Sequence, residues 1–295
     1  MYFLGGDRGQ VINAGGPQSL DEVLLREGSI LQPRSPAPLG MRGLTMMRLL
    51  AAINGLLNVG GGKAPAAHSA YVVAMLRGSY TDDTGESQRF LLVDGLGVGY
   101  GGRDHADGID AVYFVAQENY PVEFLETSYP VRLKSYGIAE DSGGPGRHRG
   151  GTGIVREYEI LADDANLSIR IDSVRNPPWG VHGGMNGGSG YAVVNPGTPQ
   201  ERKLVPLSDG NRLLKGDILR IVTGGGGGFG HPYDRAAEDV LEDVLGGFVS
   251  RESAERDYGV VIAHGKVDAE ATQRRRANRP AAKTFHRMEY VDVVS

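Results

Sequence analysis

The spacing of apolar residues predicts several helices. Between residues 44 and 57 apolar side chains recur every three or four positions, as they do along one face of an α-helix. Gly60–Gly62 follow directly and are typical of a helix C-terminus. Similar but shorter patterns predict helices at Leu20–Leu25, at Val122–Thr127, from Asp234 to Leu245, and after Ser250, which can cap a helix.

An apolar and polar alternation close to a period of two predicts strands in the second half of the chain. Two apolar runs, Ala70–Leu76 and Arg89–Val93, flank the turn Thr81–Gly85 and predict a hairpin. Turns without crossover helices separate the later strands, which favours antiparallel pairing. The expected later strands are Val131–Tyr136, Ile154–Leu161, Leu167–Asp172, Tyr191–Val194 and Asp217–Val222.

The pattern as a whole predicts an α+β protein. It is β-rich with mostly antiparallel strands and Gly-rich loops, one helix in the N-terminal half and a short helical C-terminal tail. Three parts are expected: a mixed α/β part at 1–128 whose N-terminal segment depends on a partner, an antiparallel β part at 129–233, and a helical tail with a polar extension at 234–295.

The amino-acid composition indicates a globular protein. The 295 residues suffice for a buried core, and 40% hydrophobic with 23% charged residues is typical of globular proteins. A net charge of -5 provides no general attraction for nucleic acid or an acidic membrane surface. No stretch predicts a secretory signal or a membrane span, so a cytoplasmic protein is expected. The absence of cysteine excludes disulfides and thiolate ligands.

The 46 glycines produce two stretches that resemble nucleotide-binding loops. Gly225, Gly227 and Gly230 have the spacing G-x-G-x-x-G, but no second parallel strand follows them, so a flexible glycine turn is the preferred interpretation. Gly60–Lys63 lacks the spacing of a phosphate loop, and Lys63 precedes alanine rather than serine or threonine. A nucleotide site is therefore not expected in this chain.

The densest group of chemically active side chains lies on a Gly-rich loop, residues 99–110. Histidine, carboxylate and arginine together can bind a cation, hold a carboxylate or move a proton. The alternative is a solvated turn in which aspartates bind nearby main-chain N–H groups. The residues concerned are Arg103, Asp104, His105, Asp107 and Asp110.

A second conspicuous stretch, Tyr136–Gly153, carries Arg147, His148 and Arg149 between glycines. An anion or a partner's carboxylate could dock there. Equally, the arginines could pair with acidic neighbours in a purely structural loop. The isolated histidines His68, His182 and His231 are expected to be structural, and no G-x-S-x-G stretch suggests a serine nucleophile.

Four stretches in a fixed order resemble the C-terminal half of hydantoinase B and 5-oxoprolinase B proteins. The resemblance covers about Gly28 to Lys266. The stretches are Asp141–Glu157, Pro178–Gly180 with Gly183-Gly184, Leu214–Gly230 followed by His231-Pro232, and Val249–Val261.

The resemblance implies a protein that works in a complex. Members of the family are about twice this length, and their N-terminal half carries Asn-Asp-Pro-Tyr-x-Gly-Gly-Thr-His and His-His-Ala-Asp stretches that do not occur here. We therefore expect a subunit or fragment that completes a site together with another chain carrying that missing half. ATP and a divalent metal (Mg, Mn or Zn) are expected on partners, with ATP bound by a hydantoinase A-like subunit.

Within the family, Leu39–Arg48 looks most like the acetone and acetophenone carboxylase branch. The implied reaction joins a ketone and bicarbonate with ATP to give a β-keto acid. We expect His105 and Asp107 to be catalytic, and Arg42, Arg103 and Asp110 to bind substrate. The alternatives are a subunit of an ATP-dependent hydantoinase or 5-oxoprolinase that hydrolyses a cyclic amide, and a scaffold subunit without site residues.

Overall fold

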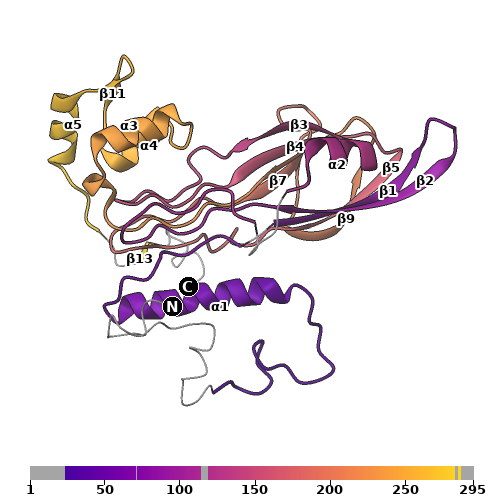
Figure 1. The fold of residues 1–295 in the computed structure, drawn as a ribbon, viewed down its shortest axis with the longest axis horizontal. Helices are drawn as coiled ribbons and strands as arrows, with labels where there is room; N and C mark the ends of the chain where they lie inside the picture. The colour runs from indigo at the N-terminus through magenta and orange to yellow at the C-terminus, as the bar shows by residue number, and fades with distance from the viewer. Residues whose placement is uncertain (1–23, 71, 114–118, 283–284, 287–295) are drawn as a thin grey trace. The chain divides into compact units, whose positions relative to one another are not determined.

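The computed structural model describes residues 24–70, 72–113, 119–282 and 285–286. The chain forms two compact units, Met1–Ala64 and Pro65–Ser295 (Figure 1). Among the described residues, none of the helices is long and apolar enough to cross a membrane.

The main element of the first unit is the helix α1, Arg42–Val59, which confirms the helix expected from the apolar spacing. The main-chain N–H groups of Gly60 and Gly62 donate to the oxygens of Leu56 and Leu57, so the glycines end the helix as predicted. The helix expected at Leu20–Leu25 lies outside the described residues except for Leu24 and Leu25, which are not helical.

The second unit contains two antiparallel sheets, and the predicted fold class is confirmed. The first sheet has the order β2-β1-β5-β9 and begins with the predicted hairpin. The second has the order β3-β4-β10-β7-β8. Their strands are β1 (Val72–Thr81), β2 (Ser87–Leu96), β3 (Val131–Ile138), β4 (Ile154–Ile160), β5 (Asp164–Arg170), β7 (Tyr191–Val194), β8 (Arg202–Lys203), β9 (Leu207–Leu213) and β10 (Ile218–Val222).

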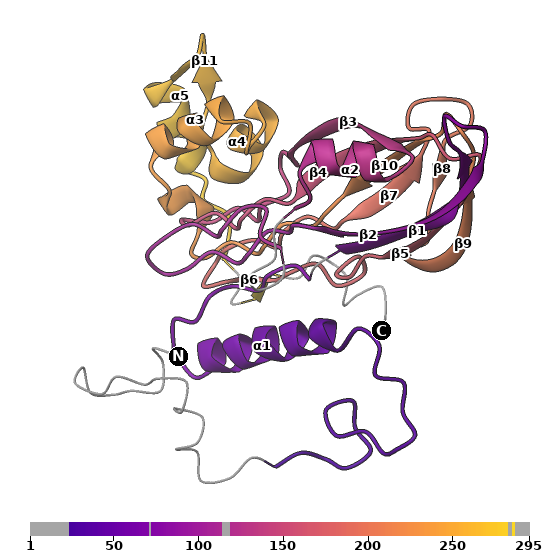
Figure 2. The same ribbon diagram turned by 45° about the vertical axis from the view of Figure 1, so that its right-hand side comes forward.

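One apolar core joins the two sheets, which lie together at one end of the second unit (Figure 2). Alternation along β4 buries Ile154, Tyr158 and Ile160, and β5 buries Leu167 and Ile169 against the same core. This is the arrangement that period-two alternation predicts. Since β1 pairs with β5, strands from both sides of residue 128 share one sheet, and the division into parts at 128 and 233 stays a prediction.

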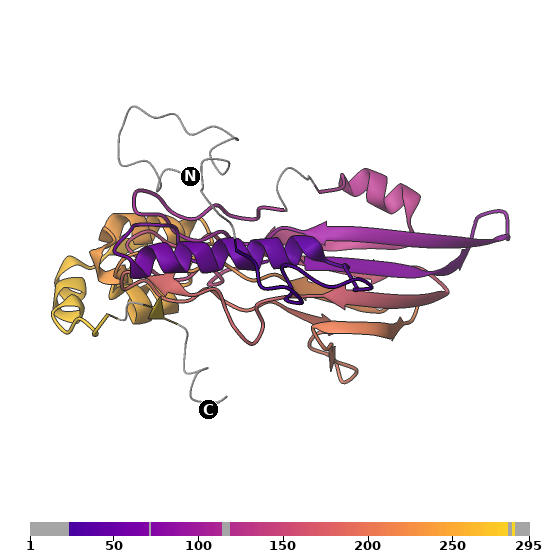
Figure 3. The same ribbon diagram turned by 90° about the horizontal axis from the view of Figure 1, so that it is seen from below.

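The helices α3, α4 and α5 lie at the opposite end of the second unit from the sheets (Figures 1 and 3). Ser250 accepts a hydrogen bond from the N–H of Ser253 and caps α4, as predicted. The polar extension expected near the C-terminus is helical in part: its arginines Arg274–Arg276 belong to α5. Asp268 caps this helix, and the arginines suit the negative end of the helix dipole. The elements outside the two sheets are α2 (Val122–Ser128), the 3-10 helix η2 (Pro232–Asp234), α3 (Ala237–Leu245), α4 (Arg251–Tyr258), the strands β11 (Ile262–Ala263) and β12 (Lys266–Val267), and α5 (Ala269–Arg276).

Between the sheets and these helices, extended Gly-rich segments run side by side and form what we call the glycine bundle, residues 99–102, 142–153, 180–188 and 224–230 (Figure 1). Gly226 donates to the oxygen of Gly151 and accepts from the N–H of Gly144. A Cβ on Gly226 would lie 2.1 Å from the oxygen of Tyr100, so only glycine fits there. In the same bundle β6 (Gly180–Val181) pairs with β13 (Phe285–His286).

The glycine bundle corrects one expectation. The sequence favours a flexible turn at Gly225–Gly230, but residues 224–229 are all buried. Gly227 and Gly228 donate to the oxygens of Ala67 and Met185, which belong to two different neighbouring segments. The glycines serve close main-chain packing rather than flexibility.

Candidate functional site

The glycine bundle holds the two stretches singled out in the sequence against each other. The N–H of Gly108 donates to the oxygen of Arg149 at 2.7 Å, and the N–H of Arg149 donates to Asp107 Oδ1 at the same distance. Asp110 Oδ1 accepts from the N–H of Thr152, also at 2.7 Å. The loop at 103–110 and the segment at 147–152 therefore form one surface.

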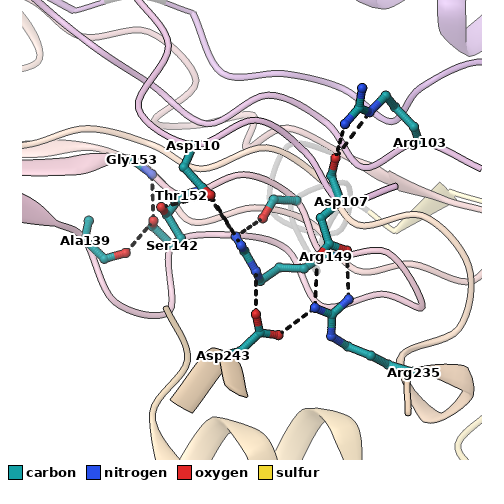
Figure 4. Close-up of polar contacts among 11 residues, drawn as sticks. Arg103, Asp107, Asp110, Ala139, Ser142, Arg149, Thr152, Gly153, Arg235 and Asp243 are labelled. Carbon is teal, nitrogen blue, oxygen red and sulfur yellow. Dashed lines mark hydrogen bonds and ion pairs between the residues drawn. The ribbon is translucent and has the colours of Figure 1, made fainter. Parts of the chain in front are cut away.

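Arg149 is the central cation of this surface (Figure 4). Its side chain is 5% exposed; Nη1 donates to Asp110 Oδ1 at 2.9 Å, and Nε lies 3.4 Å from Asp243 Oδ1. The guanidinium group also lies 4.6 Å from the ring centre of Phe248. Burial opposes the charge, but hydrogen bonding to Asp110 and the charges of Asp110 and Asp243 outweigh it and raise the pKa of Arg149.

Arg235 is a second buried cation beside it. It holds Asp107 through two hydrogen bonds, Nη1–Oδ1 at 2.7 Å and Nη2–Oδ2 at 2.8 Å, and Nη2 lies 2.9 Å from Asp243 Oδ2. Burial again opposes its charge, but Asp107 and Asp243 raise the pKa of Arg235. The paired arrangement with Asp107 fixes both position and orientation.

The carboxylates respond differently to the same surroundings. Burial raises the pKa of Asp243 more than Arg235 and Arg149 lower it. Burial also acts on Asp110, but the hydrogen bonds and charge of Arg149 outweigh it and lower the pKa of Asp110. Three carboxylates thus face two guanidinium groups, and their negative charge opposes the approach of a further anion. For Arg149, the structure favours the structural alternative over anion docking.

A cavity of about 600 Å³ lies beside this ion cluster, between residues 106–107 and 147–148 on one side and 234–243 on the other. His148 lines it with a side chain that is 19% exposed, and its Nδ1 lies 3.9 Å from Asp107 Oδ1. Burial, assisted by the charges of Arg147 and Arg235, lowers the pKa of His148 despite Asp107. The imidazole is therefore neutral at neutral pH and can accept a proton.

The structure brings together three of the five residues expected to form a site. Arg103 donates from Nε and Nη2 to the main-chain oxygen of Asp107 at 3.2 and 2.8 Å, and Asp107 and Asp110 belong to the ion cluster. His105 is 72% exposed, bonds to its neighbour Asp104 at 2.7 Å, and does not belong to the residues that line the cavity. Arg42 belongs to the first unit. The catalytic and substrate-binding roles of these residues stay predictions.

Sequence reasoning missed Arg235 and Asp243. A signal for Asp243 exists, because it is three residues after Val240 and next to Val244, on the apolar side of α3. A carboxylate at such a position needs a buried cation as its partner. Nothing in the sequence identified Arg235 as that partner.

The expected structural histidines have structural partners. His231 Nδ1 accepts from the N–H of Tyr233 and Nε2 donates to the oxygen of Pro280 at 3.0 Å. His68 packs on Tyr100 and His182 on Phe229. Within the described ranges, no three histidine, aspartate or glutamate side chains come close enough to hold a metal ion, so these residues do not fit a metal centre.

Comparison with known proteins gives the family. The sequence profile of hydantoinase B/oxoprolinase matches residues 7–232, which include Asp107, Asp110 and Arg149. A protein of Pseudomonas sp., provisionally named as the B component of a D-/L-hydantoinase, is 30% identical over 262 residues, covering 85% of this chain and 42% of its own length.

Solved structures similar to this chain include a caprolactamase and an acetone carboxylase. The crystal structure of ATP-dependent caprolactamase from Pseudomonas jessenii has a TM-score of 0.74 at 25% identity, over 86% of this chain and 46% of that one. A nucleotide-free acetone carboxylase has a TM-score of 0.59 at 20% identity, over 72% and 33%, which shows a shared fold. The chain therefore spans less than half the length of these relatives.

Proposed function

The chain belongs to the hydantoinase B/oxoprolinase family, and from that membership we propose that it is part of the B component of an ATP-dependent enzyme that opens a cyclic amide. The observation that carries the proposal is the likeness to ATP-dependent caprolactamase, which extends over most of this chain. The relative from Pseudomonas sp. also has a cyclic amide in its name. The preferred reaction is therefore the opening of a cyclic amide, whereas the sequence alone favoured ketone carboxylation.

We propose two partners for this chain. One is a hydantoinase A-like subunit that binds ATP, since the relative from Pseudomonas sp. is named as a B component. The other supplies the part of the relatives that this chain does not span. The main-chain N–H groups of Gly226, Gly227 and Gly228 all donate to neighbouring segments of the glycine bundle, so they are not free to bind phosphate oxygens. This supports the proposal that ATP binds to a partner. The divalent metal is proposed to be on a partner as well.

Within this chain we propose different roles for the site residues. His148 is the candidate for proton transfer, because its imidazole is neutral and lines the cavity. Asp107 is proposed as a positioning residue that holds Arg235 and the loop beside His148. Asp110 and Arg103 are also proposed as positioning residues, since Asp110 binds Arg149 and Arg103 binds the main-chain oxygen of Asp107.

Ketone carboxylation is the second candidate. It is favoured by Leu39–Arg48, which looks like the carboxylase branch, and it would use ketone, bicarbonate and ATP. A scaffold without site residues is the third, and the pairing of Arg149 and Arg235 with carboxylates of this same chain supports it. Replacing His148 distinguishes the scaffold hypothesis from the two enzyme hypotheses. If the chain is only a scaffold, the replacement should leave turnover unchanged.

The test is an assay of the assembled complex. This chain is coexpressed with a hydantoinase A-like subunit and the complementing polypeptide, and ATP hydrolysis is measured with hydantoin, 5-oxoproline or caprolactam and, separately, with acetone or acetophenone plus bicarbonate. Stimulation by a cyclic amide alone supports the proposal. Stimulation by ketone and bicarbonate would replace it with the second candidate, and unchanged turnover in His148→Gln would leave only a scaffold role for this chain.

A further inference from the structure

The helix α1 carries an exposed apolar band along one half of its circumference. Met46 and Leu56 are 66% and 71% exposed, and they are joined by four further exposed apolar side chains. At 100° per residue these six positions fall within one half of the helix. The members of the band are Met46, Leu49, Leu50, Ile53, Leu56 and Val59.

The apolar band is exposed, although its helical spacing predicts a buried face. The apolar pattern at residues 46–57 predicts the face that a helix buries. In the structure the buried residues of α1 are instead Met47, Ala51, Gly55 and Asn58. The most apolar side of the helix is therefore the exposed side among the described residues of its own unit. Contiguous exposed apolar surfaces of this kind mark interaction sites.

The composition of α1 favours a protein partner over a lipid surface. The charged residues among its 18 positions are Arg42 and Arg48, and it has no acidic residue. Helices that lie on membranes have a strongly charged face rich in Lys and Arg. Two arginines in five turns do not form such a face, so a polypeptide with its own apolar surface is the better occupant.

The comparisons indicate which polypeptide this is. The hydantoinase relative from Pseudomonas sp. matches 85% of this chain but only 42% of its own length, and the caprolactamase chain is matched over 46% of its length. In those proteins more than half of the chain accompanies the part that resembles this one. A polypeptide that corresponds to the unmatched portion of these relatives would need an apolar surface on this chain to bind to. The band on α1 is such a surface.

We propose that the apolar band of α1 is the docking surface for the polypeptide corresponding to the part of the family that this chain does not span. The inference rests on the proposed function, because it takes the chain to be one portion of a larger B component. It names the surface through which that component assembles.

The test uses the unmatched part of the Pseudomonas sp. hydantoinase relative as the probe polypeptide. The 295-residue chain is coexpressed with it and purified through a tag on the chain. The matched part of the same relative, coexpressed in the same way, shows that the probe can bind. The test variant is Leu50→Glu/Ile53→Glu, and the control is Val205→Glu/Leu245→Glu, since Val205 and Leu245 are also exposed, at 65% and 71%.

We expect the probe to copurify with the wild type and the control, and its recovery to fall at least tenfold with the test variant. Circular dichroism confirms that each variant retains its fold. Equal recovery with the test variant, or no binding by wild type, would overturn the proposal. So would a homodimer of the wild type that the test variant converts to a monomer, because a second copy would then be the occupant.

A second readout does not depend on destabilising substitutions. The chain has no cysteine, so Leu56→Cys and Leu245→Cys each accept a single environment-sensitive fluorophore. Adding the probe polypeptide should shift the emission of the label at 56 to the blue and leave the label at 245 unchanged. Equal shifts or no shift would contradict docking on α1. Docking without amide-stimulated ATP hydrolysis would reject the proposed function and leave the docking surface intact.

Discussion

Arg149 and Asp243 are 94 residues apart in the sequence and form a buried ion pair, with 3.4 Å between Nε and Oδ1. Arg149 belongs to the glycine bundle and Asp243 to α3, so the pair ties the C-terminal helices to the glycine bundle. Because Asp243 also binds Arg235, one carboxylate serves two buried guanidinium groups. The family profile ends at residue 232, before Arg235 and Asp243, so the cluster joins the matched region to the helices that follow it.

Replacing Asp243 should destabilise the fold strongly. Asp243→Asn leaves two buried arginines short of a counter-charge, and removal of one partner from a buried pair costs about 3–5 kcal/mol. The free energy of unfolding in urea measures the effect. Asp239→Asn on the same helix is the control, because Asp239 is exposed and loss of its charge in the first turn should cost less than about 1 kcal/mol. Equal effects of the two substitutions would contradict the role of the ion cluster.

Gly226→Ala tests the close packing of the glycine bundle. The added Cβ would lie 2.1 Å from a main-chain oxygen that cannot move alone, so we expect a loss of more than about 3 kcal/mol or failure to fold. Gly137→Ala is the matched control, since nothing lies within 4 Å of a Cβ there. A thermal denaturation scan that shows the same midpoint for both variants would contradict the described packing.

The buried pair Asp94–Arg156 links the two sheets, with 2.8 Å between Oδ2 and Nη1. Asp94→Asn should lower the free energy of unfolding by about 3–5 kcal/mol, because Arg156 is 1% exposed and loses its counter-charge. The exposed pair Asp164–Arg212 offers a control, and Asp164→Asn should cost less than about 1 kcal/mol. Urea denaturation of both variants compares the two. A mild effect at Asp94 would contradict a charged pair at this position.

His148 should make stability depend on pH. Its pKa in the folded protein is below the ordinary value, so the unfolded chain binds a proton more readily. The stabilisation is fully present above about pH 6.5 and is lost as the pH falls through the pKa of the folded state. We expect His148→Gln to reduce the slope of unfolding free energy against pH between pH 7 and 5 by up to about 1.4 kcal/mol per unit. Identical slopes for wild type and variant would refute this.

The strands and most helices could be predicted because their signals are local. Alternation along β4 and β5 and the cap at Ser250 each reflect contacts that the sequence spacing itself determines. The glycine bundle could not be predicted, because Gly226 meets Tyr100 and Gly151 only through the tertiary fold. A run of glycines has no periodic pattern of apolar residues. In sequence, glycines that form a flexible turn look the same as glycines that allow close main-chain packing.

The site shows the same division. Asp107, Asp110 and Arg149 were recognised because charged residues on Gly-rich loops are conspicuous. Arg235 was missed, since it reaches Asp107 across 128 positions of sequence. His105 illustrates the opposite case, because a histidine among carboxylates attracts attention although it is exposed and bonds to its neighbour Asp104.

The central proposal is that this chain is a necessary part of an enzyme that couples ATP hydrolysis to the opening of a cyclic amide. The most direct measurement is the amount of phosphate released and of ring-opened product formed by the purified complex, assembled with and without this chain. The account predicts matched amounts of phosphate and product with the chain and neither without it. Ring opening at the same rate in its absence, or phosphate release that depends on ketone and bicarbonate instead, would contradict the claim.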